Sequence, residues 1–134
     1  MIGLVEQLLA ELPLPDAELP GRQRLDPMAA ALRATARRHP TVFPLLLRRP
    51  VVTEGALRVR EAVYQALRDA GLAEPEVHRA ERMLSTFLIG FAASESGGRF
   101  SVTAEQLDAD LAWFGEQLIR AIAPQEEQRG RTAG

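Results

Sequence analysis

Few residues in this chain could support metal or acid-base chemistry. Its two histidines, His39 and His78, are far apart in sequence, and it has no cysteine. Glu74 and His78 are spaced i, i+4 across a proline, which is weak evidence for a metal site, and the Glu-x-x-His motif of di-iron bundles does not occur. Without cysteine there is no disulfide, no thiolate catalysis and no cysteine-ligated zinc. We therefore predict no metal site.

The sequence also has few residues whose types and spacing could form a catalytic site. Asp108 and Asp110 fall on opposite sides of a helix, so they cannot form a carboxylate pair, and helix solvation is their expected role. The chain has no Gly-x-Ser-x-Gly, no P-loop and no dinucleotide fingerprint, and Gly97-Gly98 is typical of a turn. We predict that the chain is not an enzyme, has no catalytic residue and needs no cofactor.

The stretch "RRHPTVFPLLLRRP", residues 37–50, is the strongest concentration of positive charge. It could be a nucleic-acid contact, a membrane-touching segment or a bend in a helical bundle. The residues between its arginine pairs are apolar rather than interleaved with aromatics, and the net charge of −2 with a pI near 5.7 disfavours DNA binding. We expect Arg37, Arg38, Arg48 and Arg49 to be solvated helix ends. Contact with an acidic ligand or a partner domain is the alternative.

Size and composition indicate one soluble domain. The 134 residues are 46% hydrophobic and 25% charged, near the average for globular chains. No run of about eighteen apolar residues could span a bilayer. The amino terminus lacks the basic start, uninterrupted apolar centre and cleavage site of a signal peptide, so we expect a cytoplasmic protein with no membrane contact.

Apolar spacing and breakers predict an all-α fold, an antiparallel bundle of five to six helices. No alternating pattern of a strand extends over several residues. The expected helices cover about residues 2–11, 27–38, 40–47, 54–70, 75–95 and 104–123.

Several helix ends carry explicit signals. Asp26 is a possible N-cap for a helix that starts at Pro27, and Thr53 is a possible N-cap for the next long helix, which Gly71 would end in a left-handed cap. Thr103 and Gln106 form a capping box, flanked by the hydrophobic staple of Val102 and Leu107. We divide the chain into a domain, residues 1–123, and a disordered polar tail, residues 124–134, because Pro124 opens the polar stretch.

The last two long helices have more apolar surface than one core requires. In "VHRAERMLSTFLIGFAASES" the apolar residues spread over more than one face, and Trp113 lies off the apolar line of its own helix. An outward aromatic is a candidate interface anchor. We expect a homodimer in which both helices pair with their copies. Burial of these helices within one monomer is the alternative.

Three stretches together resemble a known family: "ALRATARRHPTVFPLLLRRP", "ALRVREAVYQALRDAGLAEPEVHRAERMLSTFLIGFAASES" and "LDADLAWFGEQLIRAI". They are similar to the carboxy-terminal regulatory domain of TetR/AcrR-type bacterial transcriptional repressors, in particular the branch near the tetracycline repressor. The resemblance covers about residues 1–123. Its most specific parts are the Arg-His-Pro at 38–40, the Arg-Pro at 49–50, the Ala-Gly-Leu ending at Leu72, and "FLIGF" with Glu95 shortly after.

The resemblance implies an amino-terminal helix-turn-helix domain before this region, and we expect this chain to be without it. Its first helix is similar to the helix that connects the two domains. We therefore expect either a truncated repressor or a natural regulatory domain without its DNA reader, with DNA bound only through the missing domain.

The resemblance also implies roles for individual residues. The dimer would form through the last two long helices, with Ile89, Gly90, Ala93 and Trp113 near the partner. A small apolar or amphipathic effector would occupy a cavity enclosed by the second to fourth helices. The expected ligand-binding residues are Leu32, Thr35, Phe43, Leu46, Tyr64, Met83, Thr86 and Phe87, with plain core packing as the alternative for each. On this interpretation the segment 37–50 is a bend that places Phe43 and Leu46 against the cavity.

The leading hypothesis is thus the effector-binding and dimerising domain of a TetR-like repressor. A stand-alone helical protein that binds a small molecule, or a modulator that forms heterodimers with full-length regulators, is the alternative.

Overall fold

A computed structural model describes residues 2–41, 43–47 and 53–133 of the chain. Its elements are α1 (Ile2–Glu11), α2 (Gly21–Arg38), the short 3-10 helix η1 (Phe43–Leu47), α3 (Glu54–Asp69), α4 (Glu74–Ser96) and α5 (Ala104–Ala133). Every regular element in these ranges is helical, which confirms the predicted all-α class. Arg48 and Arg49, predicted to lie at a helix end, fall outside the described residues.

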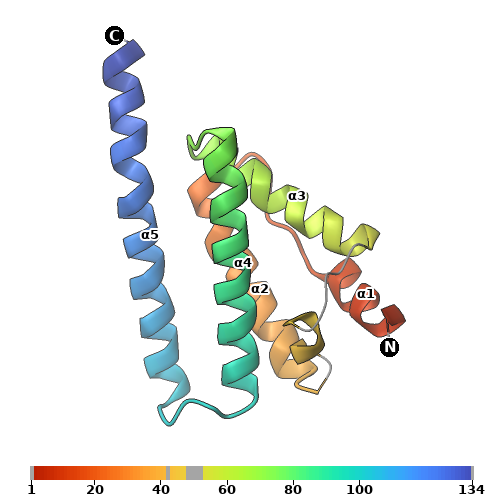
Figure 1. Cartoon of the computed structure of the whole chain (residues 1–134). Helices are drawn as coiled ribbons and strands as arrows, with labels where there is room; N and C mark the ends of the chain where they lie inside the picture. The colour runs from red at the N-terminus through yellow and green to blue at the C-terminus, as the bar shows by residue number, and fades with distance from the viewer. Residues whose placement is uncertain (1, 42, 48–52, 134) are drawn as a thin grey trace.

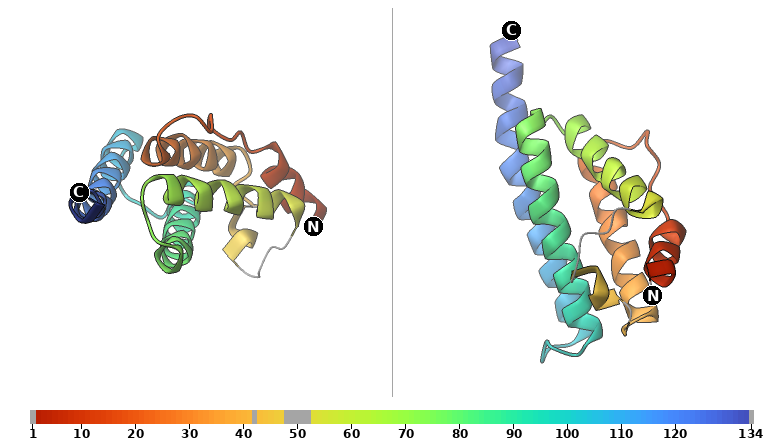
Figure 2. Two further views of the ribbon diagram at one scale, coloured as in Figure 1. Left: turned by 90° about the horizontal axis from the view of Figure 1, so that it is seen from above. Right: turned by 45° about the vertical axis from the view of Figure 1, so that its right-hand side comes forward.

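Three helices form the centre of the molecule. α2, α3 and α4 pack against one another, α1 packs against α3 and η1, and η1 also packs against α4. α5 runs antiparallel to α4 at the opposite edge of the molecule from α1, and its carboxy-terminal part extends beyond the other helices (Figures 1 and 2). α1 and α5 therefore occupy the two sides of a compact central trio.

The main core fills the space between the central helices. It is built from apolar side chains that recur every three to four residues, which places them on one face of each helix. The buried members are Leu25, Met28, Val63, Ala66, Leu67, Val77 and Leu84. Tertiary packing of these faces, rather than helix propensity alone, stabilises helices of this length.

The predicted ends of α3 are confirmed. The backbone N–H of Ala56 donates to Thr53 Oγ1 at 3.3 Å, which satisfies one of the free donors of the first turn. Gly71 has φ 105°, and the N–H of Leu72 donates to the carbonyl of Leu67 at 3.2 Å. This pair of features defines a Schellman cap, which needs a residue without a Cβ at the left-handed position.

The predicted start of α5 is confirmed, whereas half of its capping box is wrong. The N–H of Gln106 donates to Thr103 Oγ1 at 3.1 Å, as an N-cap requires. The side chain of Gln106 does not return to the cap residue but donates to Asp110 Oδ1 at 2.8 Å, four residues along the exposed face. An i, i+4 partner within the helix has replaced the reciprocal bond.

The predicted start of the second helix is wrong by about two turns. α2 begins at Gly21, so Asp26 is not its N-cap and Pro27 lies inside the helix. The extra turns are held by Arg24, which is buried, donates from Nε to the carbonyl of Leu19 at 2.8 Å and pairs with Asp69 at the end of α3. These tertiary contacts outweigh the missing N–H of one proline.

The expected boundary at Pro124 does not interrupt the last helix. α5 remains helical through Ala133. The residues after the proline include glutamine, glutamate and arginine, which are good helix formers, so the helix continues past it. Within the described ranges no helix is both long and apolar enough to cross a membrane.

Candidate functional site

A cavity of about 220 Å³ lies between α1, α2, η1, α3 and α4. Most of its lining is apolar and comes from five separate elements. The apolar residues are Leu9, Leu12, Met28, Leu32, Leu46, Ala56, Val59, Val63, Leu88 and Ile89. Three polar residues complete the wall: Arg60, Glu81 and Ser85.

Helical periodicity explains why these side chains meet. On α3 the lining residues follow the spacing i, i+3, i+4, i+7 from Ala56 to Val63, and on α4 they follow i, i+4, i+7, i+8 from Glu81 to Ile89. Both spacings place side chains on a single stripe of a helix. The cavity is therefore the place where two such stripes face each other beneath α1 and η1.

Arg58 fixes the end of α1 that reaches the cavity. Its Nη2 donates to the carbonyls of Leu9 and Ala10, each at 3.0 Å, and to the carbonyl of Leu12 at 2.8 Å. These carbonyls lie at the end of α1, where helix geometry leaves acceptors without partners. A cation at a helix carboxy terminus also complements the dipole. One α3 side chain thus holds α1 in position over the cavity.

The polar corner of the cavity centres on Glu81, which is only 7% exposed. Ser85 Oγ donates to Glu81 Oε1 at 3.1 Å, and Arg60 Nε lies 3.7 Å from the same oxygen. None of these three residues was predicted from the sequence. The spacing of α4 could have indicated Glu81, because it lies four residues after Val77 and three before Leu84. Both neighbours are buried, so Glu81 is on the face of α4 that packs against other helices.

Two of the predicted ligand-binding residues, Leu32 and Leu46, line this cavity. Thr35 and Phe43 do not: both are buried in the core. Thr35 Oγ1 donates to the carbonyl of Ala31 at 2.9 Å, and Phe43 packs in a cluster with Ala36 and Ala92. For these two, plain core packing is the observed role.

The other four predicted residues also lie outside the cavity. Met83 is 70% exposed, and Thr86 is exposed as well. Phe87 stacks on Phe114 of α5 with ring centroids 4.1 Å apart, and Tyr64 packs edge-on against a histidine of α4. At about 100° per residue, the three α4 residues fall on a different side of the helix from the lining residues, so they do not face this cavity. Their contact with a ligand stays a prediction.

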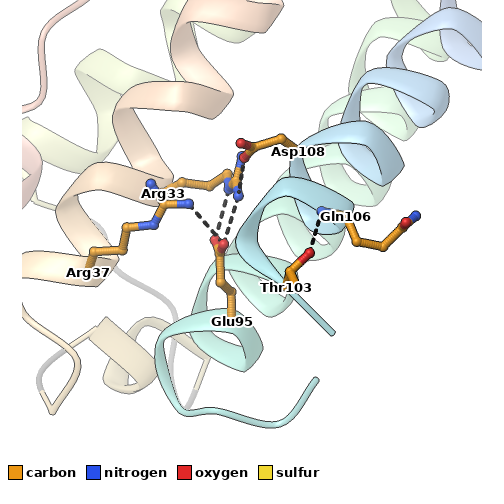
Figure 3. Close-up of polar contacts among 6 residues, drawn as sticks. All are labelled: Arg33, Arg37, Glu95, Thr103, Gln106 and Asp108. Carbon is orange, nitrogen blue, oxygen red and sulfur yellow. Dashed lines mark hydrogen bonds and ion pairs between the residues drawn. The ribbon is translucent and has the colours of Figure 1, made fainter. Parts of the chain in front are cut away.

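A second polar cluster joins α2, α4 and α5 (Figure 3). Arg33 bonds Glu95 through two contacts, Nε to Oε1 at 2.8 Å and Nη2 to Oε2 at 2.7 Å, and its Nη2 lies 2.9 Å from Asp108 Oδ1. Arg37 Nη2 adds a bond to Glu95 Oε2 at 2.9 Å. The Arg33 guanidinium is the main reason that the pKa of Glu95 falls to about 2. Asp108, predicted only to solvate its helix, is thus one of the links between α5 and the central trio.

Two residues predicted to face a partner already have contacts within the monomer. Ile89 lines the cavity, and both Ile89 and Ala93 pack against the buried cluster of Ala36, Phe43 and Ala92. The η1 segment covers that side of α4, which the helical pattern of α4 alone could not reveal.

The remaining predicted interface residues are free in the monomer. Trp113 on α5 is 62% exposed, and a Cβ added at Gly90 on α4 would meet no atom within 4 Å. Met83 belongs to the same open side of α4 as Gly90, since seven residues correspond to nearly two full turns. The monomer thus leaves Trp113 of α5 exposed, and on α4 it leaves Met83 exposed on the same side as Gly90.

In the described ranges no group of three or more acidic or histidine side chains is arranged so that it could hold a metal ion. Glu74 and His78, the weak metal candidate, lie 3.7 Å apart. The Glu74 carboxylate is engaged by Arg68, whose Nε lies 2.6 Å from Oε1, and this hydrogen bond lowers the Glu74 pKa.

Comparison with known proteins identifies the family. A family model described as "Tetracyclin repressor-like, C-terminal domain" matches residues 14–122, which is most of the chain. No curated protein and no solved structure gives a significant match.

Proposed function

The chain belongs to the family of tetracyclin repressor-like C-terminal domains, and on this basis we propose that its cavity binds a small, largely apolar effector that controls a transcriptional repressor. The observation that carries the proposal is the cavity itself, whose wall is apolar except for Arg60, Glu81 and Ser85. Apolar pockets with a few polar groups are the usual form of small-molecule sites.

The size of the cavity limits the effector. Its 220 Å³ is below the range of about 300 to 1,000 Å³ that drug-sized ligands occupy. We propose a ligand smaller than a typical drug, or one that enlarges the cavity by displacing η1 or α1. Leu32 and Leu46 would contact it from two different elements.

We further propose that the chain forms a homodimer through α4 and α5. On α5, Asp108 lies next to Arg33 of α2, and Gly115 lies next to Asp26 of α2. Trp113 is about 140° around the helix from Asp108 and about 160° from Gly115, so it lies on the side of α5 away from α2. Met83 and Gly90 give α4 a second open surface. Two such pairs of helices, related by a twofold axis, would form a four-helix contact.

The cavity is well placed to affect α1. Leu9 and Leu12, at the end of α1, form part of its wall, and by resemblance α1 corresponds to the helix that connects to a DNA-binding domain. A ligand that binds one position of α1 better than another would shift the equilibrium between them. We propose that DNA is read by a separate helix-turn-helix unit, because the net charge of −2 gives this chain little attraction to DNA.

Cavity binding can be tested by thermal unfolding with added 1-octanol, a small apolar probe. We expect a rise in the melting temperature that grows with probe concentration. The variant Ala56→Met fills the cavity with a flexible side chain and removes this rise, whereas Ala104→Met, at an exposed position of α5, keeps it. An equal rise in both variants would show that the probe binds elsewhere.

Dimerisation can be tested by light scattering and by fluorescence. The expected mass is twice 14.7 kDa. Trp113 is the one tryptophan of the chain, so its emission should move to shorter wavelength as concentration rises and the partner covers it. A monomer mass with a concentration-independent spectrum would overturn the dimer.

A further inference from the structure

We propose that Glu81 makes the cavity selective for an apolar molecule that carries a protonated amine. This inference rests on the proposed role of the cavity as the effector site and specifies the chemical class of the effector. It is carried by one juxtaposition: a carboxylate on α4 whose side chain is only 10% exposed forms part of a wall that is apolar apart from Glu81 itself and its neighbours Arg60 and Ser85.

A carboxylate in such surroundings requires compensation. Transfer of an ionised group out of water is costly unless it is paired and hydrogen-bonded. Glu81 has apolar neighbours along its own helix, Val77 and Leu84, both buried. An apolar residue at this position would pack without that cost, so the acid is difficult to explain by packing.

The protein compensates Glu81 only in part. Ser85 donates one hydrogen bond, at 3.1 Å, to Oε1. Arg60 forms an ion pair with the same oxygen, but its Nε lies 3.7 Å away, beyond hydrogen-bond distance, and its side chain is 39% exposed. No hydrogen bond reaches Oε2 from any described residue. Because an ionised carboxylate offers about four acceptor sites, Glu81 retains capacity for a donor that comes from the cavity.

An ammonium group fits this capacity better than a hydroxyl or a carboxylate does. It donates up to three hydrogen bonds, and charge-assisted bonds are about twice as strong as neutral ones. A ligand carboxylate could pair with Arg60, but it would have to lie near the buried Glu81 carboxylate, whose charge repels it. Arg60 likewise repels an ammonium, but its side chain is 39% exposed, so solvent screens it more than it screens Glu81. The apolar remainder of the wall, including Leu32 and Leu88, would cover the hydrocarbon part of the ligand.

Calorimetric titration with three probes of equal chain length tests the proposal: octylammonium and octanoate below their micelle concentrations, and 1-octanol below its solubility limit. On the unaltered protein we expect octylammonium to bind about tenfold or more tightly than 1-octanol, as a hydrogen bond to a charged group allows. Octanoate should bind most weakly. Methyl NMR signals of Leu9 and Leu88 should shift with each bound probe, since both residues line the cavity.

Two variants separate the effect of Glu81 from general electrostatics. Glu81→Gln keeps the shape and removes the charge; it should lower octylammonium affinity about tenfold and leave 1-octanol nearly unchanged. Glu105→Gln makes the same charge change at an exposed position of α5 and should alter neither. The comparison of probes on the unaltered protein does not depend on how the variants fold.

Three results of the titrations would count against the proposal, and they lead to different conclusions. Equal binding of octylammonium and 1-octanol, with cavity methyl shifts for both, would overturn the amine proposal and leave the apolar cavity site intact. Preferential binding of octanoate would also overturn it and assign recognition to Arg60. If none of the probes binds, both the amine proposal and the proposed effector cavity are wrong.

Discussion

Arg33 and Glu95 join α2 to α4 through two parallel hydrogen bonds, at 2.8 and 2.7 Å, in which each guanidinium nitrogen meets its own carboxylate oxygen. Both side chains are about nine-tenths buried. The planar fork of arginine matches a carboxylate in this way, and lysine cannot. Since Arg33 also meets Asp108, one residue connects three helices.

The first prediction concerns pH. The pKa of Glu95 in the folded protein is about 2, below its ordinary value of 4.5, because Arg33 stabilises the charged form. The stabilisation is therefore complete above pH 4.5 and is lost as pH falls from 4.5 towards 2. Glu95→Gln should lower the free energy of unfolding by about 1.5 to 3 kcal/mol at pH 7, and this difference should shrink across that window.

Urea unfolding of both proteins between pH 7 and pH 2.5 measures this difference. A difference that stayed constant with pH would mean that the Glu95 charge contributes nothing beyond shape.

The second prediction compares the two carboxylates on Arg33. The Asp108 side chain is 62% exposed, whereas that of Glu95 is 9% exposed. An exposed ion pair contributes little, so Asp108→Asn should cost less than about 1 kcal/mol. The loss should appear mainly as faster hydrogen exchange in the first turns of α5. If Asp108→Asn were as costly as Glu95→Gln, exposure would not be the deciding factor.

The third prediction concerns the contact of α2 with α3. A Cβ at Gly21 would lie 2.0 Å from the carbonyl oxygen of Ala66 and 2.7 Å from the N of Ala70, both backbone atoms. Gly21→Ala should force the helices apart and lower stability by about 3 kcal/mol or more.

Gly115→Ala serves as its control, because the nearest atom to that Cβ is Asp26 Oδ1 at 3.4 Å. This change should be neutral or stabilising by up to about 1 kcal/mol. Chemical denaturation gives both values, and a tolerated Gly21→Ala would contradict the close approach of the two helices.

The fourth prediction uses Gly90 to test the proposed dimer. A Cβ at this position meets nothing within the monomer, and alanine is the better helix former, so Gly90→Ala should stabilise the isolated chain by about 0.5 to 1 kcal/mol. In a dimer that brings helices together at Gly90, the added methyl should raise the dissociation constant about tenfold.

Sedimentation equilibrium measures the dimer, and urea unfolding at a concentration where the chain is monomeric measures the monomer. Unchanged dimerisation in Gly90→Ala would exclude Gly90 from the interface.

The sequence predicted the helical class, the α3 caps and the start of α5 because local residues determine them. Thr53, Gly71 and Thr103 act through their own turns. The start of α2 could not be found in this way, since Arg24 and Gly21 are held by contacts with α3, more than 40 residues away in the chain. The side of α4 that faces the cavity depends on where η1 and α3 lie, so Met83 was misplaced and Glu81 overlooked.

The Arg58 cap has a mechanical consequence. It holds the carboxy-terminal end of α1, next to the cavity, and α1 is ten residues long. At 1.5 Å per residue the helix is about 15 Å long. If α1 tilted about Arg58, Ile2 would be displaced more than Leu9, so a small movement at the cavity wall would become a larger one at the amino terminus of the helix.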